Sequence, residues 1–320
     1  MSKKGGLDAR QLAHARSGAY LLLADLLAEG PRPELLRAAE ASSLLAPVAR
    51  ADLDELAADH QHVFGFCAPP LEGLLLDPEG NAGGLGAERV AETYTTLGYE
   101  PDPTREEPEH LATQLRALAL LCGAEADALE DGRAPLAAAM RDQQRHLLDA
   151  HLLRWVPLFV ATVQRIGRPF PTALVTQLDV SLRHHRDGLG AVEPPTWQLA
   201  EPLDLDDPEV GLREIARYLT TPARAGVFLS RHDLTELGRA LRLPRGFGGR
   251  TRMMHQLLTA AARFDGLGAL AASMEALVAR SDAAIAPWGV AVAPWRARSR
   301  QTGVLLARLG SAALGEGDRA

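Results

Sequence analysis

The sequence is poor in cysteine. Only Cys67 and Cys122 occur among 320 residues, and neither lies in a CxxC pair or at a Cys/His spacing typical of zinc sites. A disulfide framework is therefore excluded, and free thiols suit a reducing compartment. The sequence also lacks an apolar run of the roughly 18 residues that a membrane span needs, and no hydrophobic segment follows the first residues. We expect a cytoplasmic protein without stable membrane association.

The signatures of common nucleotide and hydrolase sites are missing as well. GxGxxG, GxxxxGK[ST] and GxSxG do not occur, and the glycines of Gly80–Gly86 follow no predicted strand. The 41 acidic and 34 basic residues give a net charge of −7, and the arginines are scattered along the chain. Such a chain does not attract nucleic acid, whereas an acidic surface favours basic peptides. These features favour a binding protein without a cofactor over an enzyme.

Aromatic residues are only 5% of the chain, and alanine, leucine, arginine and glutamate dominate, which favours helix. We therefore predict an all-α fold. The clearest helix is Asp8–Ala28, where Asp8 and Gln11 form an N-cap pair before an apolar stripe. The other predicted helices are 50–64, 87–97, 108–122, 135–151, 152–166, 172–186, 208–219, 231–241, 250–264, 267–279 and 296–309. We expect Thr104 and Glu107 to cap helix 108–122, and Ser230 and Asp233 to cap helix 231–241.

One stretch between these helices has no helical period. Residues 190–209 contain four prolines, which predicts a linker between two units. We therefore predict a helical domain over residues 8–190, a proline-rich linker over residues 191–207 and a second, smaller helical domain over residues 208–310.

Two stretches of the first domain are candidates for function. Gly65–Gly86 is long, irregular and apolar, so we expect it to fold back on the helices, either as the wall of a peptide pocket or simply as a cover for the core. Arg105–Leu111 (REEPEHL) opens a predicted helix and places Glu109 beside His110. A histidine at a helix start is more often a cap or surface group than a catalyst.

These segments occur in a familiar order. Asp59–Phe64 (DHQHVF), Pro69–Gly73 (PPLEG), Pro108–Leu111 (PEHL) and His151–Phe159 (HLLRWVPLF) together resemble the TorD/DmsD/NarJ family of molybdoenzyme chaperones. The resemblance covers the predicted first domain and implies a helical bundle. It does not extend to the C-terminal domain.

The sequence departs from the pattern of that family at four positions. His60 stands where an aromatic residue is usual, and Leu71 replaces the aromatic residue of the loop. Gly73 stands in place of a serine, and Glu109 in place of an aspartate. The resemblance therefore implies a less aromatic groove than is usual in the family.

The resemblance implies a chaperone that binds the twin-arginine leader peptide and the apo form of a molybdenum oxidoreductase catalytic subunit. It would assist insertion of the cofactor and delay export until assembly is complete. Carboxylates beside an apolar groove suit the two guanidinium groups and the apolar stretch of such a leader. The residues expected to contact the peptide are His60, Phe64, Pro70, Leu71, Glu72, Leu75, Glu109, His110 and Leu111.

Two other readings of the sequence stay open. Glu107 and His110 form a single ExxH, the half-motif that diiron bundles use twice, so a helical metalloprotein is one alternative. A non-catalytic helical scaffold is the other. We expect no catalytic residues, no metal and no cofactor.

Overall fold

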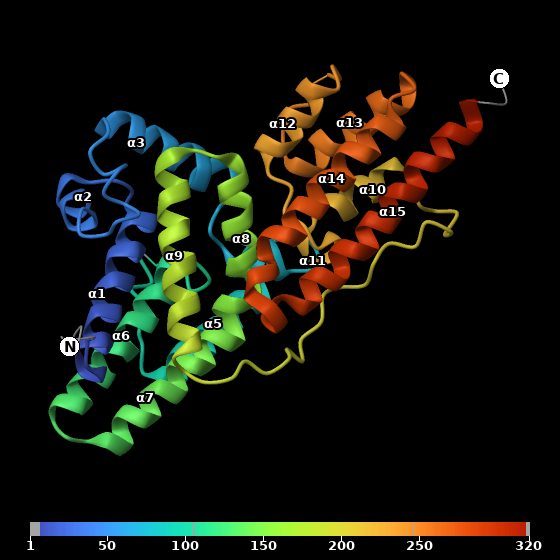
Figure 1. Cartoon of the computed structure of the whole chain (residues 1–320). Helices are drawn as coiled ribbons and strands as arrows, with labels where there is room; N and C mark the ends of the chain where they lie inside the picture. The colour runs from blue at the N-terminus through green and yellow to red at the C-terminus, as the bar shows by residue number, and fades with distance from the viewer. Residues whose placement is uncertain (1–6, 105, 245, 318–320) are drawn as a thin grey trace, which may run out of the picture.

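The computed structural model describes residues 7–104, 106–244 and 246–317. The described residues form helices and no strand, so the all-α prediction is confirmed (Figure 1). The N-terminal helices are α1 (Ala9–Ala28), α2 (Pro33–Ala39), α3 (Leu53–His60), α4 (Glu72–Leu76), α5 (Gly84–Leu97), α6 (Leu111–Glu130), α7 (Ala134–Leu147), α8 (Leu153–Ile166) and α9 (Pro169–Asp187), with π-helical turns η1 (Gln61–Cys67) and η2 (Leu148–Leu152). The C-terminal helices are α10 (Leu212–Thr220), α11 (Pro222–Ala225), α12 (Arg231–Ala240), α13 (Arg250–Arg263), α14 (Leu267–Ile285) and α15 (Ala293–Gly317), with the 3₁₀ turn η3 (Ala286–Val292).

The caps show how far local sequence determines the helix ends. Asp8 and Gln11 form the predicted capping box of α1, and Ser230 and Asp233 form that of α12. The predicted cap of α6 by Thr104 and Glu107 is wrong. That helix begins only at Leu111, and its N-cap is His110, whose side chain accepts a hydrogen bond from the amide of Ala112.

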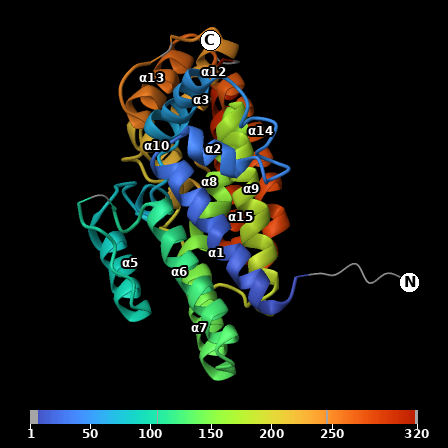
Figure 2. The ribbon, with the colours of Figure 1, turned by 90° about the vertical axis from the view of Figure 1, so that its left-hand side faces the viewer.

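The N-terminal helices enclose one apolar core. Helix α1 packs along α6, α6 packs on α7, and α8 packs on α9, while α5 lies at the side (Figure 2). Trp155 and Phe159 share one face of α8 and are fully buried, as i and i+4 residues of a core helix are expected to be. Pro157 lies inside α8 without ending it, and Gly167, with φ of +76°, terminates that helix in the left-handed region.

The C-terminal helices form a second core, in which Met253, Met254, Leu257 and Leu258 of α13 are buried. Residues 191–204 carry no helix and run along the molecule as the extended yellow strap of Figure 1. The two cores are not separate, because Phe228 and Trp295 pack into the N-terminal core. The division into domains at 190 and 208 stays a prediction.

Within the described residues, one helical stretch, Leu267–Ser311, contains an 18-residue window with a mean hydropathy of 1.2 and so is long and apolar enough to cross a membrane. This stretch comprises α14, η3 and α15, and α14 and α15 pack against each other. Gly289, with φ of +60°, interrupts the helical backbone between them. Core helices of soluble proteins pass the same composition test, so this stretch is weak support for a membrane span.

Candidate functional site

The two segments singled out in the sequence lie against each other. Leu71 and His110 form an isolated antiparallel bridge. The amide of Leu111 donates to the carbonyl of Pro70 at 2.9 Å, and the amide of Glu72 donates to the carbonyl of Glu109 at 3.1 Å. The supposedly irregular stretch 65–86 is in fact more ordered than predicted, because it contains the end of η1, all of α4 and the start of α5. The bridge therefore fixes the apolar segment at the N-terminus of α6.

The carboxylate of Glu109 ties this segment together from the inside. Glu109 is only 2% exposed, and its oxygens accept hydrogen bonds from the amides of Gly73 at 3.0 Å and Gly83 at 2.6 Å. Burial raises the pKa of Glu109, and the two amide hydrogen bonds oppose that rise without cancelling it. Both ends of the segment 73–83 are thus held by one side chain.

A second buried carboxylate, Glu72, belongs to the interior of the bundle. It is 2% exposed and accepts from Nε2 of Gln114 at 2.7 Å. Its other oxygen lies 3.4 Å from Nδ1 of His151, whose Nε2 lies 2.8 Å from the hydroxyl of Thr93. This network joins α4 to α6, η2 and α5.

A hollow of about 280 Å³ opens beside the bridged segments. It is lined by Ala28, Phe64, Pro69, Pro70, Leu71, Glu107, His110, Ala112, Thr113 and Arg116. Four residues predicted to contact a peptide therefore lie on its wall, namely Phe64, Pro70, Leu71 and His110. The apolar groups come mainly from η1 and the loop before α4, and the polar ones come from the start of α6.

The other predicted contact residues lie behind this wall. Leu75 and Leu111 are fully buried, and Glu72 and Glu109 are nearly so. Nε2 of His60 donates to the carbonyl of Leu27 at 3.0 Å, and the centroid of its ring lies 5.1 Å from that of Phe64 in an edge-on arrangement. Burial lowers the pKa of His60. These five residues support the wall, and their contact with a peptide stays a prediction.

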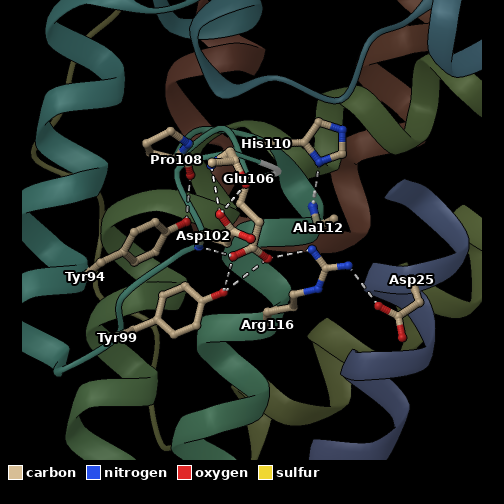
Figure 3. A network of polar contacts seen from close by, with 10 residues as sticks. Asp25, Tyr94, Tyr99, Asp102, Glu106, Pro108, His110, Ala112 and Arg116 are labelled. Atoms are coloured by element: carbon tan, nitrogen blue, oxygen red, sulfur yellow. Dashed lines mark hydrogen bonds and ion pairs between the residues drawn. The ribbon is translucent and has the colours of Figure 1, made fainter. Parts of the chain in front are cut away.

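His110 is held in one orientation at the rim of the hollow. Its Nδ1 accepts the amide of Ala112 at 3.1 Å, and burial lowers the pKa of His110 to about 4 (Figure 3). The ring is therefore neutral near pH 7, and its single proton is on Nε2 because Nδ1 is an acceptor. The side chain serves as a helix cap and presents one donor.

Next to His110 lies a charged network that the sequence analysis missed. Arg116 of α6 donates to Glu106 at 2.6 Å and to Asp25 of α1 at 2.9 Å, as Figure 3 shows. Glu106 also accepts from the amide of Asp102 at 2.9 Å and from the hydroxyl of Tyr99 at 3.3 Å. Asp25 and Arg116 are 91 positions apart, so no local spacing could have joined them. Arg105, part of the same predicted segment, lies outside the described residues.

The described residues contain no group of three or more His, Cys, Asp or Glu side chains arranged to hold a metal ion. A larger hollow of about 810 Å³ lies between η2, the start of α8 and the strap, with Arg154, Arg186 and Trp197 on its wall. Of the four motif segments, only His151–Phe159 reaches this larger hollow, through Leu153 and Arg154. The other three motif segments meet at the 280 Å³ hollow.

Residues 30–161 match a family model described as the nitrate reductase delta subunit, and this range contains all four motif segments. The selenate reductase assembly chaperone protein of Thauera selenatis is 35% identical over 95 residues, which cover 30% of this chain and 48% of that protein. The chain therefore spans about half the length of this curated relative.

No solved structure matches the chain. The two sequence matches nevertheless confirm the predicted resemblance of the N-terminal helices to the molybdoenzyme chaperone family.

Proposed function

We propose that the chain is an assembly chaperone for the catalytic subunit of a molybdenum oxidoreductase. It binds the leader peptide and the apo form of that subunit in the cytoplasm, assists insertion of the molybdenum cofactor, and delays export until assembly is complete. Its role is binding rather than catalysis. The peptide occupies the 280 Å³ hollow, against Phe64, Pro70, Leu71 and His110.

The observation that carries this proposal is the convergence of the family motifs. Segments 59–64, 69–73 and 108–111 are apart in sequence but meet at one hollow, through the bridge of Leu71 and His110. The hollow lies just below the range of about 300–1,000 Å³ that is usual for small-molecule sites. This size suits one or two anchoring side chains of an extended peptide better than a cofactor.

The proposal is tested by titrating leader peptides into the full chain and following binding by calorimetry. The peptides are the twin-arginine leaders of the molybdenum oxidoreductase subunits encoded in the source organism, each matched with a version in which both arginines are alanine. One leader is expected to bind with its affinity strongly reduced by the double replacement. Failure of every leader, and of every apo subunit, to bind the chain would refute the proposal.

A further inference from the structure

The rim of the hollow carries one carboxylate that is not already engaged. Glu107 is exposed and lines the hollow, and its side chain forms no ion pair or hydrogen bond with any described residue. Its neighbours differ, because Glu106 already accepts from Arg116 and Glu109 already accepts from two amides. A cationic group that reaches the hollow therefore finds Glu107 as the available acceptor.

The surrounding charges also favour a cation. Arg116 is the guanidinium on this wall, and it is shared between Glu106 and Asp25. Among the described residues at and beside this wall, the carboxylates of Asp25, Glu106 and Glu107 outnumber the guanidinium of Arg116 by two. Such an excess next to the apolar groups of Phe64 and Leu71 attracts a positive group that is followed by apolar side chains.

His110 adds a hydrogen-bond donor beside this charge. Because its Nδ1 is occupied by the Ala112 amide, the proton on Nε2 is the donor left for a ligand. Nε2 has no hydrogen-bond partner among the described residues, and the half-buried ring lines the hollow. A peptide backbone carbonyl is the acceptor that an extended chain brings to such a donor.

We propose that Glu107 binds the guanidinium of one leader arginine while Nε2 of His110 donates to a neighbouring peptide carbonyl. The next apolar side chain of the peptide then lies on Phe64, Pro70 and Leu71. This inference rests on the proposed function, and it assigns the cation to Glu107 rather than to the buried Glu72 and Glu109. Only one arginine of the pair binds at this position, and the other remains outside the hollow.

The test compares Glu107→Gln with Glu275→Gln, a matched loss of one exposed carboxylate on α14 of the C-terminal helices. Each full-length variant is titrated with the leader identified above and with two peptides that carry glutamine at the first or the second arginine. Glu107→Gln is expected to weaken wild-type leader binding about three- to tenfold at low salt, less at high salt, and Glu275→Gln is expected to leave it unchanged. One of the two glutamine peptides should bind Glu107→Gln as tightly as it binds the wild-type chain, because that peptide already lacks the arginine that pairs with Glu107.

A second variant tests the donor without disturbing the helix start. His110→Asn keeps a strong N-cap acceptor for the Ala112 amide but removes the Nε2 donor, so helicity and unfolding should stay near those of the wild type while binding weakens about two- to tenfold. If the wild-type chain binds the leader and both Glu107→Gln and His110→Asn bind it equally well, this inference is wrong and the proposed function stands. If the wild-type chain binds no leader, the proposed function fails and the inference fails with it.

Discussion

Replacing Glu109 by alanine should destabilise the fold, although the sequence alone suggested a residue of the binding surface. The carboxylate is buried and accepts the amides of Gly73 and Gly83. Alanine removes both acceptors and leaves the two amides without partners. The buried carboxylate therefore has a structural role, and the contact of Glu109 with a peptide stays a prediction.

The expected loss of stability in Glu109→Ala follows from the two hydrogen bonds that Glu109 accepts. A hydrogen bond to a charged group contributes about 1.5–3 kcal/mol, so the pair sets an upper range of about 3–6 kcal/mol. Two observations reduce it. Burial raises the pKa of Glu109, which means that charging this group in the folded protein is unfavourable, and Gly83 is half-buried, so water can reach its amide. We expect Glu109→Ala to lower the free energy of unfolding by about 2–4 kcal/mol, a shift of roughly 3–6 °C in Tm for a chain of this length.

Glu109→Gln provides a graded comparison. The amide side chain keeps one acceptor oxygen and removes the buried charge, so the loss should be about 1–2 kcal/mol. Gly73→Ala approaches the same contact from the other side, because a Cβ at Gly73 would lie 2.5 Å from the Glu109 carboxylate. Thermal and urea unfolding of the three variants, followed by far-UV circular dichroism at pH 7, measures these losses. An unchanged Tm for Glu109→Ala would refute the structural role of this carboxylate.

Three further results are expected from the same unfolding assays. Gly226→Ala should lower the free energy of unfolding by at least about 2 kcal/mol, since Gly226 has φ of +70° and an added Cβ would lie 2.6 Å from the amide nitrogen of Ser299. An unchanged unfolding midpoint would contradict this close approach. Arg165→Ala should cost about 3–5 kcal/mol, because it leaves the buried carboxylate of Asp233, 2.7 Å away, without its partner, and a loss below 1 kcal/mol would mean that water replaces the arginine. Burial lowers the pKa of His185 to about 3, so the unfolded chain binds a proton on this residue more readily than the folded chain does. The contribution of neutral His185 to stability should be complete above pH 6.5 and be lost as the pH falls towards 3. The free energy of unfolding in urea should therefore depend less on pH in His185→Gln.

The parts of the fold that were predicted correctly depend on short-range patterns. The cap pairs of α1 and α12 each involve residues three positions apart, so the sequence contains both partners within one helical turn. The cap of α6 was missed because His110 competes with Thr104 and Glu107, and only the bridge of Leu71 to His110 fixes where that helix begins.

The structure brings together the segments that were predicted to form the site, and the roles of their residues toward a peptide stay predictions. Motif order brought Phe64, Pro70, Leu71 and His110 to one wall, whereas the burial of Glu109 depends on a loop that closes over it. No local pattern reveals such closure.

Two departures from the family pattern are explained together by the structure. The longer Glu109 extends its carboxylate into the space that a side chain at Gly73 would occupy, 2.5 Å from the position of that Cβ. A glycine at one position therefore accommodates a glutamate at the other.

We propose that this chain is needed to assemble a molybdenum oxidoreductase. The most direct measurement is the molybdenum content per catalytic subunit, in the enzyme whose leader binds the chain, purified from cells with and without this protein. The subunit is expected to accumulate with little molybdenum when the chain is absent, and re-expression of the chain should restore the molybdenum content. Full molybdenum occupancy in cells without the chain would contradict the claim.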